Sequence, residues 1–245
     1  MEDLAFIILK YAINNTTNKY WKNSYTSIRK IYPDVKILII DDHSPFINKD
    51  KFETINCDIV ISEIPAKAEV LPYYYLHRKK IAKKVIIIHD SVFINKKIDV
   101  TNTDTYRPLW KFKHKWDLDV DTSNFIKKLN YGDELLDFYY KKTKWDGIFG
   151  AMSIMTWDFI DKIDKKFNFL KVLLSCVENR EHRMCFERIL GCVCTYMGSR
   201  KEPVYGDIHN YLKSINKKWG INYKNFNQNR QKFKKFPIVK VWTLR

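Results

Sequence analysis

VKILIIDDHS, residues 35–44, is a short run of branched apolar side chains that ends in two carboxylates. A continuous apolar run of this length is typical of a strand that is buried on both faces of a parallel sheet. The preceding stretch, residues 18–32, places its large side chains at helical spacing and is stopped by Pro33. The sequence therefore predicts a helix that leads into a buried strand with acidic residues at its carboxyl end.

The same alternation extends over the first hundred residues. Short apolar runs linked through helical segments indicate parallel strands with helices on both faces of the sheet. We therefore predict the α/β class, with a Rossmann-like, mostly parallel central sheet flanked by helices. Besides residues 35–40, the predicted strands are 4–9, 58–64 and 85–88, with a helix over 66–82.

The second half of the chain is less regular. It contains no internal repeat and no clear linker, so we expect a single domain over 1–245, with one half at about 1–100 and the other at about 101–245. In this half we predict a strand at 106–112, a helix at 123–142 broken near Gly132, an extended segment at 147–155, helices at 157–174 and 178–197, and a polar tail that ends in the apolar residues 236–242.

Composition narrows the classes of partner and compartment. The net charge of +16 is carried mostly by lysines in scattered pairs rather than along one helix, so we expect no stable nucleic-acid partner and leave a peripheral membrane contact open. The N-terminal Met1-Glu2-Asp3 has the wrong charge order for a signal peptide, and the apolar run after it is too short to span a bilayer. We therefore expect a cytoplasmic protein. The five cysteines form no CxxC pair, which indicates reduced thiols rather than a zinc site.

Polar side chains follow two of the predicted strands directly. Asp41 and Asp42 end the second strand, and His89, Asp90 and Ser91 end the fourth. Ligands of open parallel sheets bind beyond the carboxyl ends of the strands, and carboxylates at one edge repel unless a cation or hydrogen-bond donors compensate them. A hydroxyl-bearing ligand with a divalent metal would satisfy both groups. The alternative is that the Asp pair forms an Asx turn or caps the next helix.

Missing motifs exclude two common nucleotide sites. The sequence has neither GxxxxGK[ST] nor GxGxxG, and residues 11–17 after the first strand contain no glycine. This argues against ATP hydrolysis and against a dinucleotide cofactor. A nucleotide held through a metal and side-chain contacts remains, and Tyr11, directly after the first strand, joins the candidate nucleotide-binding residues.

The strand order together with residues 39–44 and 86–91 resembles the nucleotide-binding half of glycosyltransferases with the A-type fold, particularly the family 2-like group. The resemblance covers about residues 4–95. It implies that Asp41 or Asp42 contacts the nucleoside of a nucleotide-sugar donor, with a UDP-sugar favoured. It also implies that Asp90 holds Mn²⁺ or Mg²⁺ against the diphosphate, although the chain writes His89-Asp90-Ser91 where the family writes DxD.

The resemblance also suggests a second metal ligand and a catalytic base. A late His or Asp often completes the metal shell in such enzymes, which makes His209 the candidate here, unless Asp207 simply caps a helix at that point. Inverting transfer, which is favoured over a retaining mechanism, needs a carboxylate base, for which Glu181 is the first choice and Asp146 the second. Glu187, four residues after Arg183, is interpreted as a surface ion pair.

The acceptor stays open between a glycan, a protein and a lipid. A nucleotidyltransferase and a non-catalytic basic scaffold that binds nucleic acid or membrane are the alternative functions. Two further interpretations concern single motifs: the literal DxD at residues 117–121 is predicted to be a solvated acidic loop, and Trp110, Trp145 and Trp157 are candidates for stacking on sugar rings.

Overall fold

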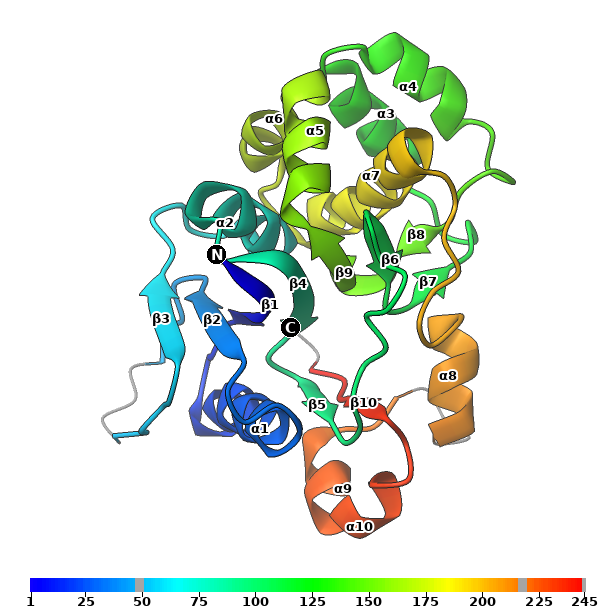
Figure 1. Cartoon of the computed structure of the whole chain (residues 1–245). Helices are drawn as coiled ribbons and strands as arrows, with labels where there is room; N and C mark the ends of the chain where they lie inside the picture. The colour runs from blue at the N-terminus through cyan, green and yellow to red at the C-terminus, as the bar shows by residue number, and fades with distance from the viewer. Residues whose placement is uncertain (47–50, 216–219, 244–245) are drawn as a thin grey trace.

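Six strands form the central sheet of the computed structural model within the residues that it describes, which are 1–46, 51–215 and 220–243. The first four strands in the order are parallel, and β9 runs antiparallel to both of its neighbours (Figure 1). The predicted α/β class with a mostly parallel sheet flanked by helices is confirmed. The strands, in sheet order, are β3 (Cys57–Ile61), β2 (Lys36–Asp41), β1 (Glu2–Lys10), β4 (Ala82–His89), β9 (Ser153–Thr156) and β6 (Tyr106–Pro108).

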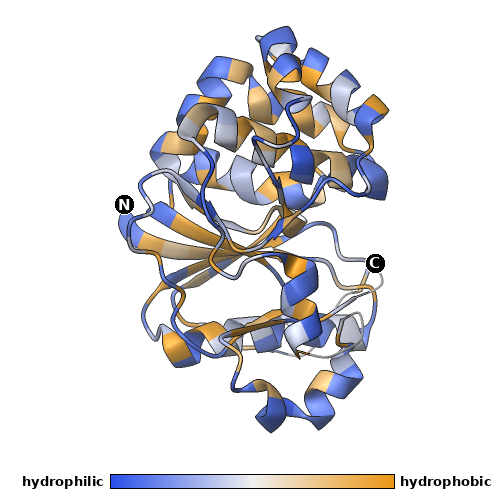
Figure 2. Ribbon diagram, turned by 90° about the vertical axis from the view of Figure 1, so that its right-hand side faces the viewer, coloured by the Kyte–Doolittle hydropathy of each residue, from blue (hydrophilic) through white to orange (hydrophobic). Residues whose placement is uncertain are grey.

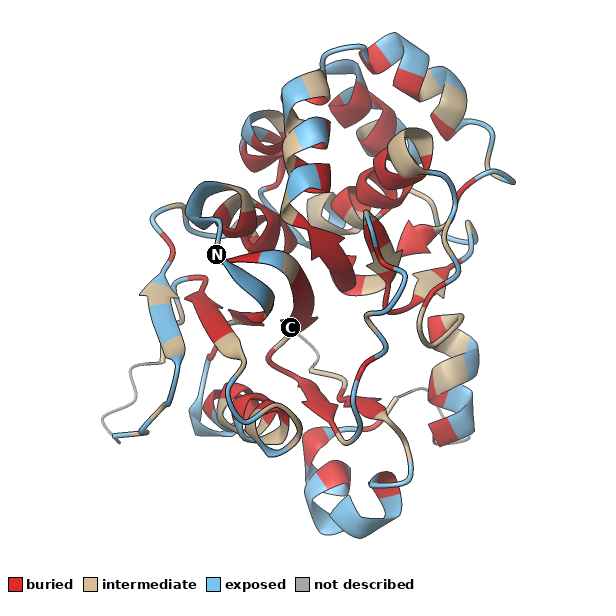
Figure 3. Ribbon diagram, in the orientation of Figure 1, coloured by how far each residue is buried: buried red, intermediate tan, exposed pale blue. Residues whose placement is uncertain are grey.

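The central strands are apolar on both sides because each side faces a separate core. In β1, Ala5, Ile7 and Leu9 pack into the larger core, whereas Phe6 and Ile8 point to the opposite face. This alternation is the ordinary period of a strand, applied to a sheet that is covered twice. Burial is lowest at the edge strand β3, which is largely exposed on its outer side (Figure 3).

Helices cover the two faces unequally. On one face lies α1 (Asn15–Ile31), and on the other lies a thicker layer whose apolar sides turn toward the sheet (Figures 1 and 2). The α1 helix begins three residues earlier than predicted because Asn14 and Thr17 form a capping box. The thicker layer consists of η1 (Ala68–Val70), α2 (Leu71–Lys79), α3 (Asp119–Lys127), α4 (Gly132–Tyr139), α5 (Trp157–Phe167), α6 (Phe169–Cys176) and α7 (Arg180–Gly198).

Two segments predicted as extended are divided in the structure, as is the predicted helix at 157–174, which becomes α5 and α6 on either side of Asn168. The predicted strand at 106–112 becomes β6 and the short β7 (Lys111–Phe112), and the extended segment at 147–155 becomes β8 (Gly147–Ile148), η2 (Phe149–Ala151) and β9. Strand β7 pairs with β8 rather than with the main sheet. None of the described helices combines the length and the apolar character needed to cross a lipid bilayer.

A long-range strand pair, absent from the sequence prediction, joins the segment after β4 to the C-terminal part of the chain. Strand β5 (Val92–Ile94) follows β4 and pairs antiparallel with β10 (Ile238–Lys240), which lies in the apolar tail. The helices α8 (Ile208–Ile215), α9 (Tyr223–Gln228) and α10 (Arg230–Phe233) lie along the chain before β10. The pairing places the residues at 240–243 next to the carboxyl end of β4.

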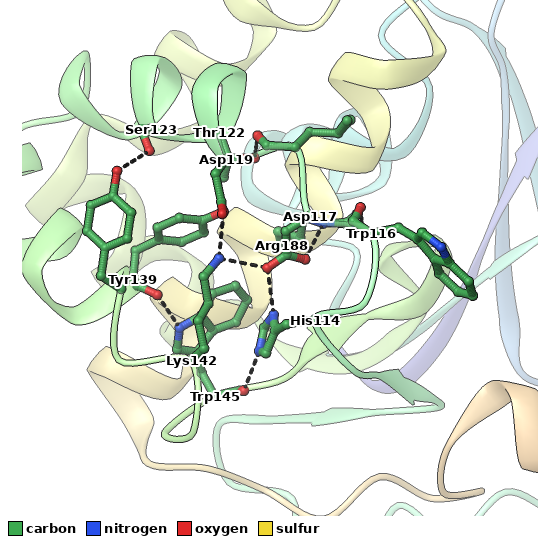
Figure 4. Close-up of polar contacts among 12 residues, drawn as sticks. His114, Trp116, Asp117, Asp119, Thr122, Ser123, Tyr139, Lys142, Trp145 and Arg188 are labelled. Atoms are coloured by element: carbon green, nitrogen blue, oxygen red, sulfur yellow. Dashed lines mark hydrogen bonds and ion pairs between the residues drawn. The ribbon is translucent and has the colours of Figure 1, made fainter.

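The predicted solvated acidic loop is wrong for Asp117. Its side chain is only 7% exposed and accepts hydrogen bonds from Arg188 Nε at 2.9 Å and Lys142 Nζ at 2.7 Å, with His114 Nδ1 at 3.0 Å (Figure 4). Arg188 of α7 is itself buried. Asp119, with a half-exposed side chain, accepts from Lys142 and from the Tyr139 hydroxyl. Asp117 therefore fixes the loop before α3 against the middle of α7.

Burial raises the pKa of Asp117, but hydrogen bonds from His114 and Lys142 outweigh it and hold the pKa well below its ordinary value. A depressed carboxyl pKa contributes stability at pH values above the unfolded-state pKa of about 3.9. That contribution is lost as the pH falls through the lower pKa of the folded protein.

Replacing Asp117 with Asn should lower the free energy of unfolding at pH 7 by about 3 kcal/mol, because it leaves the buried Arg188 without its carboxylate. Urea denaturation followed by circular dichroism measures this loss. Asp119→Asn is the matched control and should cost less, because Asp119 is half exposed. Equal losses in the two variants would contradict the assignment. The stability of Asp117→Asn should also depend less on pH below about 4 than that of the wild type.

Candidate functional site

A cavity that receives the ends of both β1 and β4, called the main cavity below, lies beyond the carboxyl ends of these strands. It has a volume of about 260 Å³ and is lined from six parts of the chain that are distant in sequence. Acidic and basic groups meet in it. Its polar lining includes Glu69 of η1, the strand-end residues His89, Asp90 and Ser91, the residues Arg180, Arg183 and Glu187 of α7, and Lys240 of β10.

The carboxyl ends of β1 and β4 are tied together by Asp90. Its backbone N–H donates to the Leu9 carbonyl at 2.9 Å, and its Oδ2 accepts from the Tyr11 backbone N–H at 3.2 Å. Asp90 is 1% exposed. Next to it, the Ser91 hydroxyl accepts a hydrogen bond from Lys240 Nζ at 2.6 Å. The candidates Tyr11, His89, Asp90 and Ser91 all line this cavity.

A second cavity of about 320 Å³ adjoins the first, since both are lined by Leu9, Tyr11, Arg180 and Arg183. It lies beyond β1 and β2, where Asp42 and the loop at 65–68 form part of its wall. The two cavities together reach the size of a small-molecule site, roughly 300–1,000 Å³.

Asp41 and Asp42 serve largely structural purposes in this loop. Asp41 pairs with Lys10 and accepts from the Ser44 backbone N–H at 2.8 Å, which closes the turn that was the alternative interpretation. Asp42 accepts from the backbone N–H groups of Ala66 at 2.7 Å and Ala68 at 3.0 Å. Of the pair, Asp42 lines the second cavity and Asp41 does not. Asp42 therefore shapes one wall of the second cavity.

Gly150 allows the backbone to pass over the end of β4. Its φ of +60° is one that residues with a Cβ rarely adopt, and a Cβ here would lie 2.9 Å from the His89 ring. His89 Nε2 donates a hydrogen bond to the Gly150 carbonyl oxygen at 2.8 Å. Because a carbonyl oxygen can only accept, this contact assigns the proton to Nε2. The close approach sets one wall of the main cavity.

Helix α7 brings Glu187 into the main cavity, against the prediction of a surface ion pair with Arg183. Gly191, one turn further along, lets the helix touch the Asp146 backbone, since a Cβ there would lie 2.2 Å from the Asp146 carbonyl oxygen. Arg183 instead faces Glu69, with Nε 3.9 Å from Oε2. Glu69 Oε1 also lies 3.7 Å from His89 Nε2. Two carboxyl groups and two basic groups thus lie around the same space.

The two glutamates carry perturbed pKa values. Burial, followed by the charge of Glu69, raises the pKa of Glu187 to about 8, against the lowering effects of Arg188, the Gly150 backbone and Arg183. Burial also raises the pKa of Glu69, while Arg183 and, more weakly, Lys240 lower it. A carboxyl group that titrates near neutral pH in a cavity is suited to acid–base chemistry.

The two residues predicted as bases lie outside the main cavity. Glu181 is exposed in the first turn of α7. Asp146 is held by Arg200 at 2.7 Å and faces Lys111 at 3.5 Å, at a separate small pocket. The structure thus groups neither of them with Asp90. Glu187 was missed because the sequence does not show which face of α7 turns toward the sheet.

The residues present do not fit the divalent-metal site expected from Asp90 and His209. His209 lines a different cavity with Trp116 and Lys113, where its backbone N–H is capped by Asp207 Oδ1 at 3.0 Å. Over the described ranges, no three His, Cys, Asp or Glu side chains are grouped to hold a metal ion. At the end of β4 the structure places the Lys240 ammonium on the hydroxyl of Ser91, the residue after Asp90.

None of the three tryptophans predicted to stack on sugar rings lines the main cavity, which is lined by a tryptophan that the sequence analysis did not single out. Trp110 and Trp145 are fully buried, and Trp157 donates its indole N–H to the His77 carbonyl. Trp242, two residues after β10, lines the main cavity instead. The signal that could have found this segment is Lys240, a charged residue between the apolar Val239 and Val241.

Comparisons with known proteins yield a distant structural likeness. No protein-family model matches the sequence, and no curated protein matches it. The chain is similar to the crystal structure of S. aureus TarS 1–349, with a TM-score of 0.42 and 12% sequence identity over 77% of this chain. It spans 56% of that chain. A likeness at this level assigns no function and no site residue.

Replacing Glu187 with Gln should stabilise the protein at pH 8 by at least about 1 kcal/mol, because the half-buried Glu187 carboxylate is costly to ionise in its desolvated position beside Glu69. The unfolded state loses this proton near pH 4.3 and the folded state near pH 8, so wild-type stability should fall as the pH rises through that window. Urea denaturation between pH 5 and pH 8.5 measures both effects. The exposed Glu181→Gln should change neither, and a wild-type-like pH dependence of Glu187→Gln would contradict the assignment.

Proposed function

We propose that the protein is a glycosyltransferase that moves a sugar from a nucleotide-diphosphate sugar, with a UDP-sugar favoured, to an acceptor hydroxyl with inversion. The observation that carries the proposal is the meeting of the Asp90 strand end, the α7 arginines and the Glu187 carboxyl around one cavity. Such a cavity beyond the carboxyl ends of parallel strands is where α/β proteins bind nucleotides. The acceptor is a hydroxyl of a glycan, a protein or a lipid.

The two adjoining cavities divide the donor between them. The nucleoside occupies the second cavity, where the Tyr11 ring at the junction offers a face for stacking and Asp42 supports the wall. The diphosphate lies at the junction, next to Arg180 and Arg183, which line both cavities. Arginine forks match phosphate oxygens in geometry as well as in charge. The sugar then lies in the main cavity, toward Glu187 and Trp242.

Glu187 is proposed as the general base. Its carboxylate takes the proton of the acceptor hydroxyl as the hydroxyl oxygen attacks the anomeric carbon of the sugar. The bond from that carbon to the diphosphate oxygen breaks, and its electron pair leaves with the nucleoside diphosphate. Arg180 and Arg183 meet the negative charge that develops there.

The charged surroundings of Glu187 give the reaction its pH dependence. Burial and, after it, the charge of Glu69 disfavour its ionised form, whereas Arg188 and Arg183 favour it. His89 faces this group of charges through Glu69, with its Nε2 3.7 Å from Glu69 Oε1. The base must be ionised to accept a proton. Activity should therefore rise with pH toward a plateau above about 8.

Thermal unfolding against a panel of nucleoside diphosphates, with and without Mn²⁺, tests the donor site. One nucleotide should raise the melting temperature, and Tyr11→Ala should weaken its binding by about 1–3 kcal/mol, the range for loss of base stacking. Tyr11→Phe keeps the ring and serves as the matched control. No stabilisation by any member of the panel would contradict the proposed function.

Release of UDP from UDP-sugars, with water in place of the acceptor, tests the base. Glu187→Gln should lower kcat at pH 8.5 by roughly 10²-fold or more, because Gln cannot accept the proton. Glu181→Gln and Asp146→Asn should retain activity. The wild-type rate should climb between pH 6.5 and pH 8.5, and loss of activity in Glu181→Gln or Asp146→Asn alone would transfer the role to that residue.

A further inference from the structure

One cationic side chain of the main cavity comes from β10, far from the other residues of the site. Lys240 is paired with Val92 of β5, and the Val241 backbone N–H donates to the Ser91 carbonyl at 2.9 Å. Its neighbours Val239 and Val241 are fully buried in an apolar cluster on the other side of the strand. Because side chains alternate along a strand, Lys240 is directed toward the cavity.

The Lys240 ammonium lies at the strand end that carries Asp90. Its Nζ donates to the Ser91 hydroxyl at 2.6 Å and to the Val241 carbonyl at 3.1 Å, and the residue is 6% exposed. Its charge reaches across the cavity to Glu69. A lysine in an otherwise apolar strand is costly to bury and breaks the local pattern, which is the kind of exception expected at a functional site.

The charges of the cavity lining already balance without an added ion. Among the described residues that line it, the carboxyl groups of Glu69, Asp90 and Glu187 face the cations of Arg180, Arg183 and Lys240. With Glu187 protonated, as its raised pKa of about 8 favours at neutral pH, the lining has a net positive charge. A second positive ion beside Lys240 would be repelled, whereas a diphosphate would be attracted.

We propose that Lys240 is a phosphate-binding residue of the donor site and supplies, at the end of β4, the positive charge for the diphosphate, so that donor binding needs no divalent cation. This inference rests on the proposed function. It assigns the role expected of a metal at Asp90 to an ammonium group delivered by β10. Lys240 contacts the phosphates, while Ser91 holds the ammonium in place.

Calorimetric titration with UDP and with uridine tests the inference, in EDTA and in Mn²⁺. Wild-type protein should bind UDP in EDTA within about threefold of its affinity in Mn²⁺. Lys240→Met should bind UDP at least 10-fold more weakly, with an unchanged affinity for uridine, which has no phosphate to lose. Lys240→Arg should retain most of the UDP affinity. If the nucleotide panel selects another base, its diphosphate and nucleoside replace UDP and uridine.

Lys235→Met is the matched control, since Lys235 is exposed in the same part of the chain and outside the cavity lining. UDP binding by the wild type only in Mn²⁺, or wild-type UDP affinity in Lys240→Met, would overturn the role of Lys240 while leaving the proposed function intact. Failure of the wild type to bind any nucleotide, with or without Mn²⁺, would overturn the proposed function itself. The wild-type comparison needs no variant and can overturn the proposal even if Lys240→Met does not fold, in which case Lys240→Arg reports on the residue itself.

Discussion

The register of β1 against β4 is the constraint on which the site depends. Leu9 lies opposite His89, so the next residue, Asp90, can use its N–H on the Leu9 carbonyl and its carboxylate on the Tyr11 amide. A shift by one residue would turn every side chain of β4 to the other face of the sheet. It would also shift β5, which follows β4 in the chain and pairs with β10. The two-sided core and the cavity edge are therefore set by the same pairing.

The cavity holds charges that a fold optimised for stability would avoid. Glu69 has an oxygen with no hydrogen-bond partner among the described residues, and it lies close enough to raise the pKa of Glu187. Elsewhere, buried charge is satisfied: Asp117 and Arg188 bind each other, and the remaining oxygen of Asp117 is occupied by Lys142 and His114. The contrast separates a structural ion network from a group of charges arranged around open space.

The elements that could be predicted from the sequence are those that depend on interactions between residues close together in the chain. The strands β1, β2 and β4 and the helices α1 and α7 are governed by local periodicity and capping, so they were predicted to within a few residues. The pairing of β5 with β10 depends on contacts across most of the chain, and no local signal carries it. The burial of Asp117 likewise depends on Arg188, 71 positions away.

The same distinction between local and long-range interactions explains why only part of the candidate site was predicted. Residues directly after strands, such as Asp90 and Ser91, reach the cavity because the strand direction alone decides their place. The choice between Glu181 and Glu187 depends on which side of α7 meets the sheet, and that is set by packing at Gly191. Asp41 accepts a hydrogen bond from the nearby Ser44 backbone N–H and forms a turn instead of facing the cavity. The sequence does not show whether such a carboxylate binds a ligand or the local backbone.

Because β10 follows the strands of the central sheet in the sequence, it is synthesised after them and can pair with β5 only at a later stage of folding. During synthesis, β1, α1, β2 and β4 have all left the ribosome long before residue 238, and N-terminal elements generally fold first. Their sheet can form with its acidic edge complete while the cationic strand is still missing. The cavity gains its net positive charge only when β10 docks on β5, so a nascent or proteolytically nicked chain would retain the sheet but lack the charge that attracts phosphate.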